Sequence, residues 1–321
     1  MDDKGKINAA AAPQPLTAAG GQRRIALLVA YDGTRYAGWQ RQANAPSVQG
    51  ELEKALSRLT KAAVTLVGCS RTDAGVHASA HVSHFETSAR IPAERLPLAL
   101  GTVLPPDIAC LAAQDVPARF HARFSARGKQ YAYYIWNAPR PSPMLRRYSA
   151  FEARPLDLEA MRETAAVLTG EHDFRAFQAA GSPSASTWRR LYSIEVSQLR
   201  QPGFVSPGPL CEPLREGLRW APLRRASLSD SWLFPYFAQP FVQSRDKPGL
   251  GLIRIVVHGS GFLYNMMRIL AGTLMYAGLH KTDPAAVKKA LADGERCAMG
   301  KTLPACGLCL ERVDYAERLF Y

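Results

Sequence analysis

Two charged side chains that could do chemistry lie two residues apart in the segment Gly68–Ala78, whose sequence is GCSRTDAGVHA. Arg71 is a permanent cation. Asp73 carries a carboxylate, which could attack a carbon as a nucleophile or remove a proton as a general base. Gly68 and Gly75 allow the backbone to bend sharply and to lie close to a ligand. The ordinary alternative is a turn in which Asp73 accepts hydrogen bonds from its own backbone.

The segments on either side of this connection predict strands. Ala63–Val67 is apolar and β-branched, and Ala80–Phe85 is an extended run of mixed polar and apolar residues. A carboxylate on a short loop between two buried strands would be held stiffly, and a nearby arginine would favour its ionised form.

Another arginine lies within the apolar segment Gly261–Met275, which predicts a buried helix. Because an arginine does not lose its charge, Arg268 in such a helix needs a carboxylate or phosphate partner. Asp73 is the partner that we expect. The alternative is that the Arg268 guanidinium reaches solvent while its aliphatic stem stays buried.

Basic and aromatic residues are interleaved along Phe120–Trp136. Basic groups bind phosphates and aromatic faces stack on exposed bases, so this segment could contact RNA. The alternative is an ordinary aromatic strand that follows a solvated basic segment.

The segment Arg71–Ala78 resembles the signature of the TruA-type tRNA pseudouridine synthases, although many members have glycine where this chain has Ser70. Further resemblances cover residues 24–200 and 249–315 in pieces. They include Tyr31–Thr34 with Gly38–Gln40, Phe120–Arg123, the strand Tyr131–Tyr133, a helix with Phe262, Asn265, Met266 and Arg268, and a closing strand over Pro304–Val313.

This resemblance implies an isomerase that converts uridine to pseudouridine at positions 38, 39 and 40 of tRNA, in the anticodon stem-loop. It implies a homodimer that needs no metal or other cofactor. Asp73 would be the catalytic carboxylate, attacking the sugar or removing a proton from it, and Arg268 would pair with it. Arg71 would help to keep Asp73 ionised. Tyr131 would stack on the target uracil and help to remove its C5 proton.

The basic residues around this site would then hold the RNA backbone while the target base leaves its stack, which costs a few kcal/mol. We expect Arg123 and Arg127 to do so, together with Arg71 and Lys129.

Strand and helix patterns alternate in both halves of the chain, which predicts an α+β fold. The resemblance implies two ferredoxin-like (RRM-like) domains, with antiparallel sheets side by side and the active-site cleft between them. We place a disordered tail at residues 1–22, the first domain at 23–118 and the second at 119–321. A proline-rich insertion at about residues 201–248 interrupts the second domain.

The composition narrows the class of protein. Of 321 residues, 47% are hydrophobic, which is typical of a globular chain, and the formal net charge of +13 favours a polyanionic partner such as RNA. The six cysteines are scattered, and neither a signal peptide nor a clean membrane span is evident, so we expect a cytoplasmic protein without membrane contact.

Signals for other chemistries are weaker. Cys306 and Cys309 form a single C-x-x-C pair, whereas a structural zinc site needs four ligands. On a strand, His84 would face away from His77 and His81, so these three predict no metal site. Two alternatives to the main hypothesis stay open: a pseudouridine synthase that acts on another RNA, and an RNA-binding protein without catalysis.

Overall fold

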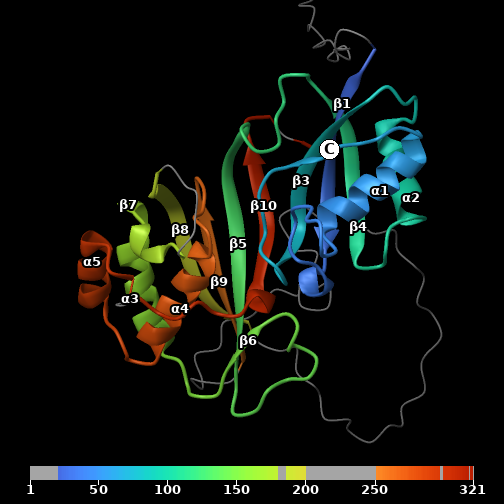
Figure 1. The fold of residues 1–321 in the computed structure, drawn as a ribbon. Helices are drawn as coiled ribbons and strands as arrows, with labels where there is room; N and C mark the ends of the chain where they lie inside the picture. Colours follow the sequence, from blue (N-terminus) through green and yellow to red (C-terminus); the bar gives the residue numbers. More distant parts are fainter. Residues whose placement is uncertain (1–20, 180–185, 200–250, 297–298, 318, 321) are drawn as a thin grey trace, which may run out of the picture.

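The computed structural model describes residues 21–179, 186–199, 251–296, 299–317 and 319–320. Within these ranges, ten strands form one mixed sheet with helices packed against it (Figure 1). The strand order is β4-β1-β3-β10-β5-β9-β8-β7, with β2 beside β3 and β6 beside β5. All but the last two residues of the predicted tail, and the whole predicted insertion at 201–248, lie outside the described residues.

The N-terminal half forms one side of the sheet. Its strands are β1 (Arg23–Tyr31), β2 (Val67–Gly68), β3 (His77–Thr87) and β4 (Ile108–Val116), and its helices are α1 (Val48–Thr60) and α2 (Leu96–Gly101). Helix α1 begins directly after Ser47, whose hydroxyl caps it by accepting a hydrogen bond from Gly50 N at 3.2 Å. Val48, Leu52 and Leu56 are buried on its inner face.

The predicted strand over Ala63–Val67 is wrong. Only Val67 and the following Gly68 pair with β3. The backbone amide of Val64 instead donates to Ser57 Oγ at 3.0 Å, and that of Leu66 to Glu53 Oε1 at 2.9 Å. Side chains of α1 therefore satisfy this segment's backbone, and it runs along the helix instead of joining the sheet.

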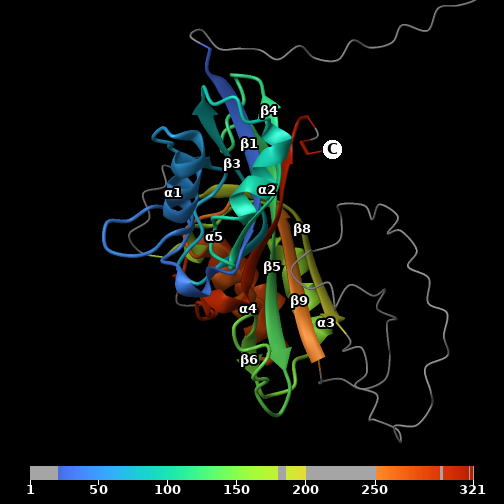
Figure 2. The same cartoon turned by 90° about the vertical axis from the view of Figure 1, so that its right-hand side faces the viewer.

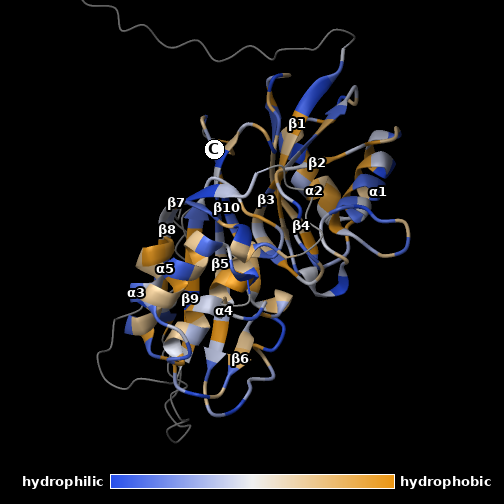
Figure 3. Cartoon of the chain, turned by 60° about the vertical axis from the view of Figure 1, so that its left-hand side comes forward, coloured by the Kyte–Doolittle hydropathy of each residue, from blue (hydrophilic) through white to orange (hydrophobic). Residues whose placement is uncertain are grey.

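The C-terminal half forms the other side of the sheet. Its strands are β5 (Ala126–Asn137), β6 (Ala150–Glu152), β7 (Gly170–Asp173), β8 (Trp188–Leu199), β9 (Gly251–Gly259) and β10 (Leu308–Tyr315), and its helices are α3 (Leu158–Leu168), α4 (Met266–Gly278) and α5 (Pro284–Asp293). Helix α4 carries a long hydrophobic stretch and lies against β5 and β9 (Figure 3). It begins at Met266, later than the predicted Gly261, because Asn265 before it has a left-handed φ of 59°.

The last strand joins the two halves. Strand β10 pairs antiparallel with β5, and parallel with β3 through Cys309 opposite His77 and Leu310 opposite Ala78. One hydrophobic core includes buried residues of both halves. Viewed along the sheet, the strands run as one continuous layer (Figure 2). No helix among the described residues is both long and apolar enough to cross a membrane.

Candidate active site

The loop between β2 and β3 carries Asp73 and is held by the segment that follows β1. Trp39 N donates to Thr72 O at 3.1 Å, and Gly75 N donates to Tyr36 O at 3.3 Å. Gly38 has a φ of 97°, and a Cβ on it would lie 2.3 Å from Thr72 O. The two backbones are thus in direct contact, and a side chain at residue 38 would separate them.

Aromatic residues hold the loop from beneath. The Tyr31 hydroxyl lies 2.8 Å from Thr72 Oγ1, and the buried Trp39 ring stacks on His81 with centroids 3.6 Å apart. His81 Nε2 lies 3.0 Å from Ser70 O. Burial lowers the pKa of His81 to about 3, so at neutral pH the uncharged ring donates through Nε2 to that carbonyl.

The Asp73 carboxylate faces Arg268 of α4. Asp73 Oδ2 lies 3.7 Å from Arg268 Nη1, and the two side chains are 27% and 19% exposed. Arg268 Nε donates to Leu303 O at 2.7 Å and Nη1 donates to Asn265 Oδ1 at 2.7 Å. The guanidinium is therefore anchored independently of Asp73. Burial raises the pKa of Asp73 above its ordinary value, and the charge and hydrogen bonding of Arg268 act against that rise.

Tyr131 lies beside the same loop. Its hydroxyl is 3.0 Å from Ser70 Oγ, and its ring meets the edge of Phe262 with centroids 5.0 Å apart. Burial raises the pKa of Tyr131, so the hydroxyl is protonated at neutral pH. Ser70 is not among the described residues with positive φ. Serine therefore fits this backbone without strain, and its hydroxyl contacts Tyr131.

The chain also matches known proteins along most of its length. The family profile described as "tRNA pseudouridine synthase" matches residues 27–125 and 164–316. A tRNA pseudouridine synthase A of Moorella thermoacetica is 43% identical over 293 residues, which are 91% of this chain and 99% of that protein. One from Ruminiclostridium cellulolyticum is 38% identical over 91% of this chain and 100% of its own. The chain belongs to the tRNA pseudouridine synthase family.

This membership confirms the resemblance to the TruA type and the prediction of an isomerase. Asp73 and Arg268 lie inside the matched segments of the tRNA pseudouridine synthase profile, whereas Tyr131 falls in the gap between them. The structure thus brings Tyr131 to the loop independently of that match.

The other three predicted site residues are exposed: Arg71, Arg123 and Arg127. Arg71 forms no ion pair with any carboxylate of the described residues. The Arg123 guanidinium lies 5.7 Å from the centroid of the Phe124 ring. Arg127 stands near the start of β5, where its carbonyl accepts from the Tyr192 hydroxyl at 3.2 Å. The contacts of the site therefore unite Asp73, Arg268 and Tyr131 but do not include these three arginines.

Sequence reasoning gave no role to Asn265 as a partner of Arg268. Asparagine tolerates the left-handed backbone more readily than most residues, and this tendency was the one sequence signal for a special role of Asn265.

Among the described residues, no group of three or more His, Cys, Asp or Glu side chains could hold a metal ion. His77 accepts from Gly33 N at 3.1 Å through Nδ1, and its Nε2 lies 2.9 Å from Arg147 O.

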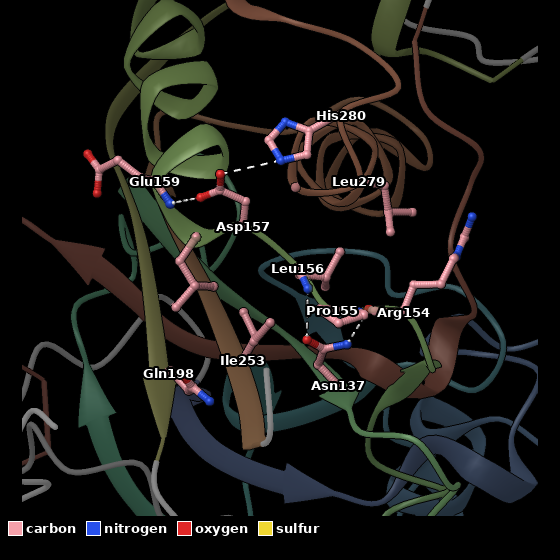
Figure 4. Close-up of a pocket in the computed structure, with 12 residues that line it drawn as sticks. Asn137, Arg154, Pro155, Leu156, Asp157, Glu159, Gln198, Ile253, Leu279 and His280 are labelled. Atoms are coloured by element: carbon pink, nitrogen blue, oxygen red, sulfur yellow. Dashed lines mark hydrogen bonds and ion pairs between the residues drawn. The ribbon is translucent and has the colours of Figure 1, made fainter. Parts of the chain in front are cut away.

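A cavity of about 660 Å³ lies away from this site, between the ends of β5 and β9 and helices α3 and α4 (Figure 4). The polar side chains Asn137 and Asp157 that line it form hydrogen bonds or ion pairs with other groups of the protein. Asn137 donates to the carbonyls of Glu152 and Arg154, each at 2.8 Å, and accepts from Leu156 N at 3.1 Å. Asp157 caps α3 and lies 3.4 Å from His280. None of the predicted site residues lines this cavity.

Proposed function

We propose that this chain converts uridine to pseudouridine at positions 38, 39 and 40 of the tRNA anticodon stem-loop, with Asp73 as the catalytic carboxylate. The observation that carries the proposal is that Asp73, on the loop beside Tyr131, lies 3.7 Å from Arg268 of α4 in a member of the tRNA pseudouridine synthase family.

The reaction breaks the bond between C1′ of the ribose and N1 of uracil, and forms a bond between C1′ and C5. The C5 proton leaves and N1 is protonated, so the product is an isomer and no redox partner takes part. Asp73 acts on the sugar, either by attacking C1′ or by removing a ribose proton. Tyr131 stacks on the uracil and assists the removal of the C5 proton. Arg268, whose own position is fixed by Leu303 O and Asn265, keeps Asp73 aimed and ionised.

The two halves of the sheet would correspond to two ferredoxin-like domains, residues 23–118 and 119–321. The site lies where they meet, because the first contributes the Asp73 loop and the second contributes Tyr131 and Arg268. Arg71, Arg123 and Arg127 are exposed and would contact the RNA backbone. We also propose a cytoplasmic homodimer that needs no metal or other cofactor.

Pseudouridine mapping on an unmodified tRNA tests the proposal. Purified protein with EDTA present is expected to form pseudouridine at positions 38–40, and replacing one of these uridines by cytidine should remove only that product. Product at another position or in another RNA would favour the alternative substrate. Tight RNA binding without product would favour a protein that only binds RNA.

Replacing Arg268 by glutamine should change the pH dependence of the rate. Since Arg268 lowers the pKa of Asp73, its loss raises that pKa. Ionised Asp73 is the active form, so the acidic limb of kcat against pH moves to higher pH, and the plateau falls on the order of 10²-fold. Arg268→Lys should shift the limb less, because it keeps a charge. An unshifted limb in Arg268→Gln would show that another group controls it.

A further inference from the structure

Lys129 is a cation close to the proposed active site. It lies on β5 two residues before Tyr131, so both side chains point to the same face of the sheet, about 7 Å apart along the strand. The Lys129 side chain is partly buried and forms no ion pair with a carboxylate of the described residues. Val313 of β10 lies opposite Lys129, and the next residue, Asp314, forms ion pairs with His258 at 2.6 Å and with Arg312 at 2.9 Å.

The charges of two further cations act on Lys129. Its pKa lies below the ordinary value, chiefly because burial disfavours the charged ammonium, and the charges of Arg123 and Arg189 lower it further. Arg189 lies over the turn that leads to Phe262, since a Cβ on Gly261 would be 3.6 Å from its Nε. Phe262 in turn contacts Tyr131. Lys129 and Arg189 thus both lie close to the tyrosine that would stack on the base, and the charge of Arg123 acts on Lys129.

An exposed aromatic ring lies beside this cluster. Phe124 is 77% exposed, and the Arg123 guanidinium lies 5.7 Å from the centroid of its ring. Single-stranded nucleic acids bind to such surfaces, with phosphates on the basic groups and bases on the rings. The Lys129 ammonium, partly buried and without an ion pair among the described residues, is costly to keep charged in the free protein, and an anionic ligand would remove that cost.

We propose that Lys129, with Arg123 and Arg189 around it, binds the backbone phosphate that adjoins the target uridine. This inference rests on the proposed function, because it takes Tyr131 as the platform for the uracil. The spacing along β5 allows one nucleotide to place its base on Tyr131 and a neighbouring phosphate on Lys129. The site would help to keep the flipped nucleotide out of its stack.

Binding measurements with Lys129→Gln test the inference. The Kd for an unmodified anticodon-arm RNA should rise about tenfold, and the slope of log Kd against log salt should fall by about one, as for the loss of one phosphate contact. Lys129→Arg should bind like the wild type. Lys288→Gln, an equal change of charge at an exposed position of α5, is the control and should leave both quantities unchanged. The melting temperature of Lys129→Gln should equal or exceed that of the wild type.

An RNA with a neutral methylphosphonate on one side of the target uridine identifies the contact. At one of the two linkages it should weaken wild-type binding as much as Lys129→Gln does, and it should weaken the variant no further. Kd and salt slope in Lys129→Gln equal to those of Lys288→Gln would overturn the inference. The inference would also be overturned if Lys129→Gln binds more weakly but neither methylphosphonate weakens wild-type binding. The weaker binding of the variant would then come from a disturbed fold. If the variant does not fold, wild-type binding that neither linkage weakens would overturn the inference as well.

Product and binding are measured separately, so the two proposals can fail separately. Wild-type protein that binds the RNA through Lys129 but forms no pseudouridine would refute the proposed function and keep the phosphate site. If the wild type forms pseudouridine but its RNA binding does not depend on Lys129, the proposed function is kept and the phosphate site is refuted. A wild type that does not bind the RNA would overturn both.

Discussion

Asp73→Asn should reduce the rate of pseudouridine formation on the order of 10⁴-fold or more, because the amide can neither attack the sugar nor take up a proton from it. Asparagine has nearly the same shape as aspartate, and Arg268 keeps its bonds to Leu303 O and Asn265, so the loop should stay in place. Single-turnover kinetics on an unmodified anticodon arm measure the chemical step, and a binding assay on the same RNA checks that affinity persists.

The fold of this variant offers an internal check. Because the folded state raises the pKa of Asp73, its charge destabilises the protein at neutral pH, and this effect disappears as the pH falls through that pKa. Asp73→Asn should therefore melt at a temperature at least as high as the wild type at pH 7, with a smaller difference in acid. Asp293→Asn, at an exposed position of α5, is the matched control for rate. Full activity in Asp73→Asn would remove this residue from the centre of the mechanism.

Gly38→Ala should strongly destabilise the fold, lowering the free energy of unfolding by about 3 kcal/mol or more. Two costs add. Alanine is strained at a φ of 97°, and its Cβ would lie 2.3 Å from Thr72 O. The backbone carbonyl can yield only if the Asp73 loop moves, so the kcat of the folded fraction should fall as well.

Urea unfolding and single-turnover kinetics of Gly38→Ala measure the two effects. Gly101→Ala in α2 is the control, because a Cβ there meets no atom within 4 Å and φ is not positive. It should be neutral or stabilising by up to about 1 kcal/mol. If Gly38→Ala unfolds at the same urea concentration as the wild type, the contact between the two backbones is not tight.

Elements with local signals could be predicted from the sequence. Ser47, Asp157 and Asp283 each cap the helix that follows, and Gly294 ends α5 with a φ of 74°. Each signal acts within a few residues of its target, so it is visible in the chain itself. Asp73 was also the expected partner of Arg268, with a guanidinium that reaches solvent as the alternative, and the structure places the two side chains 3.7 Å apart.

What could not be predicted depends on distant partners. Val64 and Leu66 are β-branched or apolar as a strand requires, but side chains of α1 bind their amides, and composition does not reveal this. The start of α4 depends on the left-handed conformation of Asn265. The parallel pairing of β10 with β3 depends on residues more than 200 positions apart, for which no local pattern exists.

That pairing sets the order in which the catalytic centre can be assembled during protein synthesis. Leu310 lies opposite Ala78, directly after the Asp73 loop, and Tyr133 donates to Pro304 O at 2.6 Å. Arg268 also needs Leu303 O as an acceptor. A nascent chain that ends at residue 300 therefore contains every proposed catalytic side chain but lacks the strand that closes the sheet beside them. The nascent chain should gain activity only after β10 has left the exit tunnel and found β3, a slow, long-range closure.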